Sequence, residues 1–255
     1  MSALKALNLM RPDIVTDLTE VVAAFTTRLG GVSMAPFDQL NLGLGTDDVR
    51  ERVLENRRRV TADLGFAAED LATPGQVHGC DVEIVTTAGH YPARDGLVTA
   101  VPGVLLAVVA ADCAAVLLVD PEARVVGACH AGWRGAVGGV LENTVEAMAE
   151  LGAHPNRLRT WISPCIGWRA FQVSPDVADR FHPDDVRWLP GDDRPHVDLS
   201  GAITRRFASI GLNRDRVSAD GRCTASTPEL FFSHRAQNGM TGRMMGLVGM
   251  RKPTS

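Results

Sequence analysis

The sequence lacks both the long apolar run of a membrane protein and the charge excess of a nucleic-acid-binding protein. Its longest apolar stretch, residues 101–119, is interrupted by Pro102, Gly103 and Asp112, whereas a membrane-spanning helix needs about 20 mostly apolar residues. Residues 1–11 hold too short an apolar region for a signal peptide. With 26 Lys and Arg against 30 Asp and Glu, the net charge is −4, so we expect neither a membrane nor a nucleic acid as partner.

Cysteine and histidine are scarce. The five cysteines form an odd set without dense spacing, which is typical of a protein in the reducing cytoplasm and argues against a disulfide scaffold. The seven histidines include no His-x-His pair. Because imidazole is the ligand that suits copper, this supply supports at most one mononuclear metal site and argues against a multicopper oxidase.

The composition is that of an ordinary globular protein, with 45% apolar and 22% charged residues. Without repeats, low-complexity segments or a clear linker, we expect one domain over residues 1–255. Apolar patterning predicts strands at residues 21–25, 82–84, 104–110, 114–119, 124–129, 161–166 and 247–250. Helical periodicity and capping residues predict helices at 46–64 with Thr46 as N-cap, at 137–151, from Pro175, and at 198–210. This interleaving predicts an α+β or α/β layered sandwich with mixed sheets.

Three short motifs follow or interrupt apolar runs, where loops at strand ends commonly carry functional residues. They supply His78, Cys113 and His130. His and Cys side chains suit zinc, and three protein ligands leave a fourth position open for water or substrate, as in catalytic zinc sites. The spacing is much longer than in a zinc finger, so an alternative stays open in which Cys113 is a small buried residue and both histidines are ordinary polar groups.

Two neighbours of these motifs support the metal site. Asp112 adjoins Cys113 and is placed to orient a ligand histidine or to accept a proton. Gln76 lies two residues before His78, on the same face if the chain is extended, and is placed to bond a substrate or a metal-bound water. The alternatives are that Asp112 is a turn residue or a helix cap, and that Gln76 is a solvated polar residue in a loop. The remaining cysteines and histidines have other roles in this interpretation: Cys129, Cys165 and Cys223 as structural thiols, and His90, His154, His182 and His196 as solvated loop residues.

Two further segments are candidates for substrate binding. Glycines between Gly132 and Gly139 precede and open a helix, an arrangement that suits an anion such as phosphate, and Arg134 would add a bidentate donor. Tight packing of the helix on a sheet is the alternative, and the spacing matches no dinucleotide or Walker motif. Arg28 and Asn41 lie in turn-rich loops and offer a guanidinium and an amide to a polar ligand.

Taken together, the motifs resemble one family over nearly the whole chain. They are Thr26–Ser33, Leu40–Gly43, Gln76–Gly79, Ala111–Cys113, His130–Gly135, Ser163–Gly167 and Phe232–Arg235. The chain is similar to the YfiH-like polyphenol oxidase or laccase-domain proteins, also described as peptidoglycan editing factors and as purine nucleoside enzymes. The resemblance implies an α-β-β-α sandwich and a zinc site on His78, Cys113 and His130. It also implies phosphorolysis of adenosine, inosine, guanosine and methylthioadenosine, and deamination of adenosine.

The chain departs from the family pattern at Trp168–Val173, where such proteins commonly carry a Cys and a Tyr-Glu pair, and at Ala114–Ala115. Zinc lowers the pKa of a bound water to about 7, which suits deamination, whereas phosphorolysis needs an anion pocket. Two alternatives remain: a hydrolase with Cys113 as nucleophile and His78 or His130 as base, and an editing factor acting on cell-wall precursors. A mononuclear copper polyphenol oxidase is less favoured.

Overall fold

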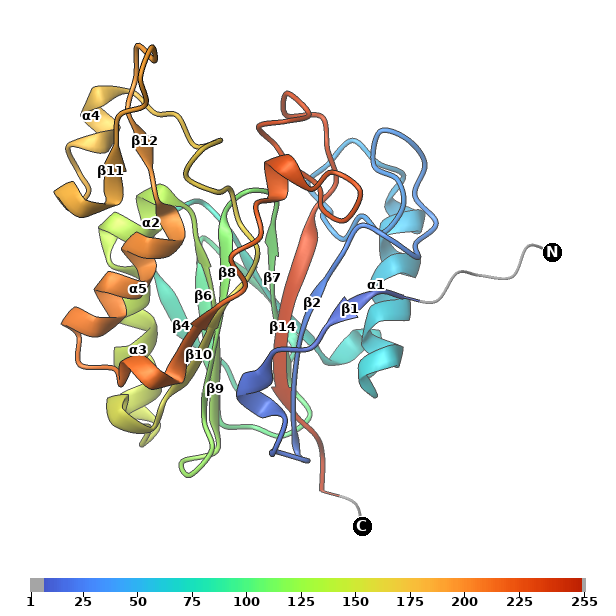
Figure 1. The fold of residues 1–255 in the computed structure, drawn as a ribbon. Coiled ribbons are helices and arrows are strands. Elements are labelled where there is room, and N and C mark those ends of the chain that lie inside the picture. Colours follow the sequence, from blue (N-terminus) through green and yellow to red (C-terminus); the bar gives the residue numbers. More distant parts are fainter. Residues whose placement is uncertain (1–6, 254–255) are drawn as a thin grey trace.

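In the computed structural model, which describes residues 7–253, two six-stranded mixed sheets pack face to face (Figure 1). From edge to edge, the first sheet consists of β1 (Leu9–Met10), β2 (Val21–Thr26), β14 (Met244–Met250), β7 (Leu105–Ala110), β3 (Leu71–Gly75) and β5 (Gly89–Pro92). The second consists of β13 (Val217–Ala219), β10 (Arg159–Ile162), β8 (Ala114–Asp120), β9 (Val125–Ala131), β6 (Gly96–Thr99) and β4 (Val82–Ile84).

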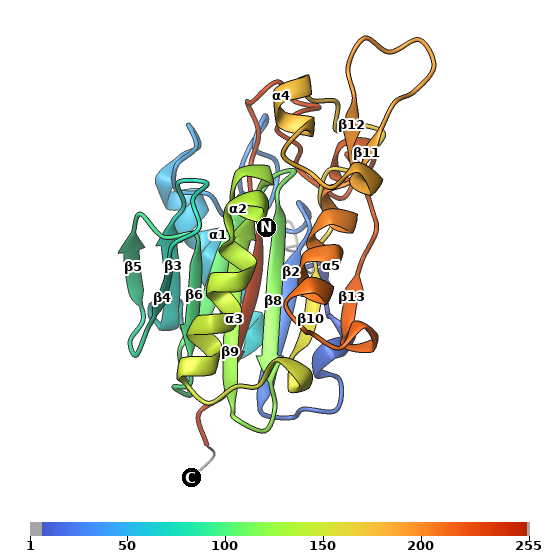
Figure 2. The ribbon, with the colours of Figure 1, turned by 90° about the vertical axis from the view of Figure 1, so that its left-hand side faces the viewer.

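The helices cover the outer faces of both sheets, except for the short fourth helix, which lies beside a small hairpin at one end of the sandwich (Figure 1). They are α1 (Arg50–Leu64), α2 (Trp133–Gly138), α3 (Val140–Glu150), α4 (Pro175–Ala178) and α5 (Leu199–Ser209), with short 3₁₀ turns at Asp13–Val15, Ala68–Asp70, Pro155–Arg157, Pro183–Asp185, Arg214–Arg216 and Thr224–Ser226. A small hairpin pairs β11 (Val186–Arg187) with β12 (His196–Val197). Helix α1 lies on the first sheet, whereas α2, α3 and α5 lie on the second, as Figures 1 and 2 show.

The apolar side chains fill three layers. In β8, Leu117 and Val119 pack between the two sheets, and Val116 and Leu118 pack under the helices on the second sheet. A continuous apolar strand is therefore covered on both faces. A third cluster, which includes Val60 and Leu247, seals α1 against the first sheet. The architecture is an α+β sandwich with mixed sheets in a single domain, as the sequence predicted.

Three elements differ most from the prediction. Helix α1 begins at Arg50 and not at Thr46, because the Thr46 hydroxyl donates to Gly43 O at 2.9 Å inside the preceding loop. The helix expected at 137–151 is two helices, α2 and α3, broken at Gly139, whose φ of 105° is left-handed. The strand expected at 161–166 is β10 and ends at Ile162. The short helix at Pro175 and the end of α1 at Gly65 are confirmed.

One end of the sandwich gathers the loops of interest. The segment after β3 carries His78, the connection between β7 and β8 carries Cys113, and His130 lies near the end of β9. Since β8 pairs with β9 in antiparallel register, with Ala114 opposite Ala131, the start of one strand meets the end of the other. None of the helices within residues 7–253 combines the length and apolarity that a membrane crossing requires.

Candidate metal centre and active site

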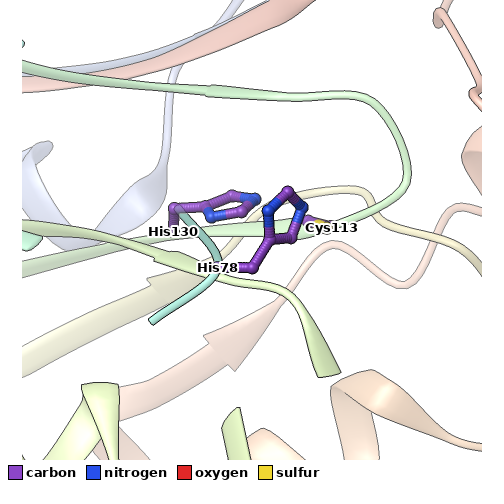
Figure 3. Close-up of side chains that lie close together, drawn as sticks. All are labelled: His78, Cys113 and His130. Carbon is purple, nitrogen blue, oxygen red and sulfur yellow. The ribbon is translucent and has the colours of Figure 1, made fainter. Parts of the chain in front are cut away.

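His78, Cys113 and His130 come together although they lie far apart in the sequence. Their ligand atoms all lie within 4.8 Å of one another (Figure 3). The two imidazole rings meet edge to face, with centroids 4.9 Å apart and an angle of 81°. His78 is exposed, Cys113 is partly buried and His130 is buried, so the cluster opens to solvent on one side. Within the described part of the chain, no other group of three such ligand side chains converges in this way.

Asp95 orients one of these ligands. This fully buried residue directly precedes β6, and its Oδ1 lies 2.8 Å from His130 Nδ1. A carboxylate accepts a hydrogen bond, so Nδ1 carries a proton and Nε2 is the nitrogen that would bind a metal, after releasing its own proton. The backbone of Asp95 contributes as well, because its carbonyl accepts a hydrogen bond from His130 N at 2.7 Å.

The same carboxylate also shapes the loop that carries His78. The backbone N–H groups of Val77, His78 and Gly79 donate to the two carboxylate oxygens at 3.1, 3.1 and 2.7 Å. His78 has a φ of 61°, a left-handed conformation that is unfavourable for a residue with a Cβ. The three hydrogen bonds stabilise this conformation, so Asp95 positions two ligands at once.

The electrostatics of the cluster favour the ligand form of the cysteine. Burial raises the pKa of Cys113, but hydrogen bonds and charge from His130 and His78 outweigh burial and lower this pKa to about 6. Burial lowers the pKa of His130, but hydrogen bonds to Asp95 and Cys113 outweigh it and raise this pKa to about 9. A thiolate is the form of cysteine that binds metals. Cys113 is therefore ready to act as a ligand at neutral pH.

Gly132 leaves room for the cluster. A Cβ at this position would lie 2.9 Å from Cys113 Sγ, closer than non-bonded atoms approach, and 3.3 Å from His78 Cδ2, a tight contact. A side chain is thus excluded where the ligand atoms converge. With one thiolate, two imidazoles, an oriented His130 and this space, the residues fit a zinc ion with three protein ligands.

The three residues line a cavity of about 510 Å³, large enough for a small organic molecule. Trp133 and Phe171 provide aromatic surface, and Arg134 and Arg243 provide positive charge. Arg134 is exposed, and its guanidinium lies 4.4 Å from the centroid of the Trp133 ring. The arrangement is able to hold a flat, polar ligand beside the ligand cluster.

Asp112 lines this cavity and forms no hydrogen bond to a histidine within residues 7–253, so it does not have the first of the two roles that the sequence suggested. Its role as a proton acceptor stays a prediction. Its Oδ1 accepts a hydrogen bond from the Thr224 hydroxyl at 2.6 Å, and its Oδ2 accepts one from Arg235 N at 2.6 Å. Both oxygens therefore hold neighbouring segments in place. The carboxylate that orients His130 is Asp95, which sequence reasoning missed because a single Asp ahead of a short strand carries no distinctive signal.

Of the four residues expected to bind substrate, two line the cavity and two do not. Gln76 lines it, but its amide pairs with the backbone of Val109 through two hydrogen bonds of 2.8 Å. Arg134 lines it as described above. Arg28 instead donates to Asp38 O and Pro228 O, each at 2.9 Å. Asn41 is fully buried and accepts hydrogen bonds from Gly43 N and Arg243 N. Both hold loops in place outside the cavity.

Most of the other histidines and cysteines lie where the sequence placed them. Cys129 and Cys165 are buried, and His90, His154 and His182 are exposed. His196 is the exception, since it is buried and not solvated. Its Nε2 lies 2.6 Å from Asp192 Oδ2 and its Nδ1 3.1 Å from Trp168 O, so the imidazole is satisfied inside the small hairpin.

The two packed sheets and the His-Cys-His cluster define an α+β protein with one candidate metal centre. Residues 22–251 match the family described as "Multi-copper polyphenol oxidoreductase laccase", and the chain belongs to this family. A purine nucleoside phosphorylase of Deinococcus radiodurans is 46% identical over 229 residues, 89% of this chain and 88% of the relative.

Further relatives agree in sequence and in structure. The purine nucleoside phosphorylase YfiH of Escherichia coli is 36% identical over 237 residues, 89% of this chain and 93% of the relative. Among solved structures, YlmD from Geobacillus stearothermophilus superposes with a TM-score of 0.89 at 34% identity, covering 97% of this chain and 98% of that one. A YfiH protein from Bacillus licheniformis gives the same TM-score at 30% identity, with the same coverage of both chains.

Proposed function

We propose that this chain is a zinc-dependent purine nucleoside phosphorylase that also deaminates adenosine. The substrates would be adenosine, inosine, guanosine and methylthioadenosine. The observation that carries the proposal is the convergence of His78, Cys113 and His130 in one cavity. The names of the relatives, which are purine nucleoside phosphorylases, support the same reaction class.

His78, Cys113 and His130 would hold the zinc ion. When bound, zinc supplies Lewis acidity and lowers the pKa of a water molecule to about 7. Asp95 keeps the proton of His130 on Nδ1 through its hydrogen bond, so the opposite nitrogen stays available as a ligand. Gly132 keeps side-chain atoms out of the space that the three ligand atoms share.

The cavity would hold the nucleoside beside this centre. Trp133 and Phe171 offer aromatic surface for a purine ring, and we propose that Arg134 contacts the nucleoside. In phosphorolysis, a phosphate oxygen forms a bond to C1′ of the ribose while the bond from C1′ to the base nitrogen breaks. The base leaves with the electron pair and takes up a proton. In deamination, water adds to C6 of the adenine ring and ammonia leaves.

A second candidate function is a hydrolase with Cys113 as nucleophile, which the lowered pKa of this thiol favours. The two functions differ in their need for a metal, since the hydrolase would keep its activity in the presence of a chelator. A mononuclear copper oxidase would oxidise phenols and contain copper. A factor acting on cell-wall precursors would not turn over nucleosides.

The test is a product assay on purified protein loaded with zinc. We expect release of the purine base from inosine and from methylthioadenosine only when phosphate is supplied, and conversion of adenosine to inosine without phosphate. Cys113→Ala should lose both activities. Cys129→Ala is its matched control, because Cys129 is a buried core thiol that lies outside the cavity. Phenol oxidation without any change in the nucleosides would contradict the proposal. All five cysteines are free, which suits the cytoplasmic location that we propose.

A further inference from the structure

A second, smaller cavity adjoins the one that contains the ligand cluster. It has a volume of about 300 Å³ and shares Gln76, Val109 and Arg243 with the larger cavity. Its two positively charged residues are Arg57 and Arg243, and no Asp or Glu of residues 7–253 lines it. The lining of this cavity is therefore positively charged.

Arg57 projects from α1 and has no acidic partner within residues 7–253. Its Nε donates to the Leu42 carbonyl at 2.9 Å, and this is its only hydrogen bond to the described residues. Burial and the neighbouring Arg50 lower its pKa to about 10. The two arginines that follow it behave differently, since Arg58 and Arg59 both form salt bridges with Glu55. The terminal nitrogens of Arg57 are thus left for a ligand.

Arg243 directly precedes β14 and also has no salt bridge within the described chain. Its Nη1 donates to the carbonyls of Thr241 and Gly242 at 2.7 and 3.0 Å. Burial lowers its pKa, although the charges of Cys113 and Asp112 oppose this shift. Gly43 allows this placement, because a Cβ there would lie 2.6 Å from Arg243 Cγ. The missing side chain at Gly43 therefore leaves room for the side chain of Arg243.

The two arginines are held by the same segment. The Leu42 carbonyl accepts from Arg57, while the Leu42 amide donates to Arg243 O at 3.0 Å. Asn41 Oδ1 accepts from Arg243 N at 2.9 Å. Neither guanidinium has a salt bridge within residues 7–253, although the charges of Cys113 and Asp112 act on Arg243 from a greater distance. Two half-buried cations that line one cavity are more stable when an anion joins them. Guanidinium groups match the oxygens of a phosphate in geometry and charge.

We propose that this cavity binds a phosphate group, with Arg57 and Arg243 as its ligands and Asn41 as a positioning residue for Arg243. This inference rests on the proposed function: free phosphate bound here would be the nucleophile of phosphorolysis, because Arg243 lines both cavities. The phosphate monoester of a nucleotide has the same chemistry and is the alternative source.

The glycine-rich start of α2 is a weaker candidate for this anion. Helix α2 has only six residues. Its glycines are explained by close packing, since a Cβ at Gly135 would lie 2.9 Å from Gly79 O. Arg134 is exposed and stacks on Trp133, whereas Arg57 and Arg243 are half-buried.

Calorimetric titration of the zinc-loaded protein with inorganic phosphate tests the inference without nucleoside. Arg57→Gln and Arg243→Gln should each raise the dissociation constant of phosphate by about tenfold or more, because each removes a charge-assisted contact. Arg58→Gln makes the same chemical change one residue further along α1, where the charge is paired with Glu55. It should change the constant less than about twofold. Arg134→Gln should have a smaller effect than Arg57→Gln.

Two further variants keep the test valid if a substitution harms folding. Arg57→Lys keeps the charge and should retain more phosphate binding than Arg57→Gln. Gly43→Ala leaves both arginines in the sequence but would displace Arg243, and should also weaken phosphate binding. Titration with a nucleoside monophosphate distinguishes the source: tighter binding of the nucleotide, lost in the same variants, would assign the cavity to a phosphate monoester.

The inference and the proposed function fail in different ways. Phosphate binding that depends on Arg57 and Arg243, in a protein that does not cleave nucleosides, would uphold the phosphate site and overturn phosphorolysis. Phosphorolysis with an unchanged KM for phosphate in folded Arg57→Gln and Arg243→Gln would uphold the reaction and overturn this site. If Arg58→Gln weakened phosphate binding as much as Arg57→Gln, the effect would come from the net charge of the protein, and this outcome would also overturn the phosphate site.

Discussion

Asp95 accepts a hydrogen bond from His130 Nδ1 at 2.8 Å, and the same carboxylate accepts three backbone N–H groups from the loop that carries His78. Burial raises the pKa of Asp95, but His130 and the N–H groups of Gly79 and Val77 outweigh this effect and hold the pKa below its usual value. One buried charge thereby connects a ligand in the loop after β3 with a ligand in β9.

Replacing Asp95 by Asn should weaken zinc binding by about 10- to 100-fold, the usual effect of removing a carboxylate behind a ligand histidine. The measurement is a competition titration with a zinc chelator. Asp120→Asn is the matched control, because Asp120 is equally buried and accepts several hydrogen bonds at the far end of β8. It should reduce the free energy of unfolding by about 1–3 kcal/mol and leave zinc affinity unchanged. Equal loss of zinc in both variants would show that Asp95 only supports the fold.

Cys113→Ala should remove both the metal and the two nucleoside activities, since it deletes one of three protein ligands. Metal content after gel filtration and product formation are measured on the same sample. Cys129→Ala should keep the zinc, because the Cys129 thiol is fully buried in the core under the helices of the second sheet. Full activity in Cys113→Ala would eliminate both the zinc enzyme and the cysteine hydrolase.

Gly132→Ala tests the space around the ligand atoms. The added methyl would lie 2.9 Å from Cys113 Sγ, so we expect zinc affinity to fall by about tenfold or more as the ligands are pushed apart. The variant should keep a circular dichroism spectrum like that of the parent. Unchanged zinc affinity would show that the three ligand atoms do not need the space beside Gly132.

The pH dependence of the chelator-treated protein follows from the two shifted pKa values. The pKa of Cys113 is lowered from 9.0 to about 6, so its thiolate contributes stability that is present above pH 9 and is lost as the pH falls through 6. The pKa of His130 is raised from 6.5 to about 9, so its contribution is present below pH 6.5 and is lost as the pH rises through 9. The thiolate–imidazolium pair therefore persists between about pH 6 and about pH 9.

Alkylation of Cys113 as a function of pH measures this pair. In the chelator-treated protein, the alkylation rate should reach half its maximum near pH 6. The buried Cys129, whose pKa is raised by burial to about 12, should not react in the folded state. A midpoint near 9.0 for Cys113 would contradict the electrostatic account of the cluster.

The sequence predicted the parts of the fold that depend on local patterns. Long strands such as β8 were predicted because burial on both faces leaves a continuous apolar run, and helices α1 and α5 were predicted from the residues that begin or end them. Short edge strands such as β1, β5 and β13 were not predicted, since two to four residues are too few to carry a periodic signal. Gly139 was taken as part of a helix, and only its left-handed backbone shows the break between α2 and α3.

The ligand side chains were predicted from their motifs, whereas their supporting residues depend on tertiary contacts. Asp95 lies 35 residues from His130 in the sequence, and no local pattern links the two. Arg57 is one of several arginines in α1, and only the structure shows that it lacks an acidic partner among residues 7–253. Asn41 was predicted to bind substrate, but its side-chain oxygen accepts hydrogen bonds from the backbone N–H groups of Arg243 and Gly43.

Metal content measured together with phosphorolysis tests the central proposal most directly. The purified chain is freed of metal by a chelator, reloaded with zinc or copper, and assayed for release of hypoxanthine from inosine with and without phosphate. We predict one zinc per chain, loss of phosphorolysis on chelation and recovery with zinc. Three or four bound coppers with phenol oxidation, or phosphorolysis that persists in metal-free protein, would contradict a single zinc centre on His78, Cys113 and His130.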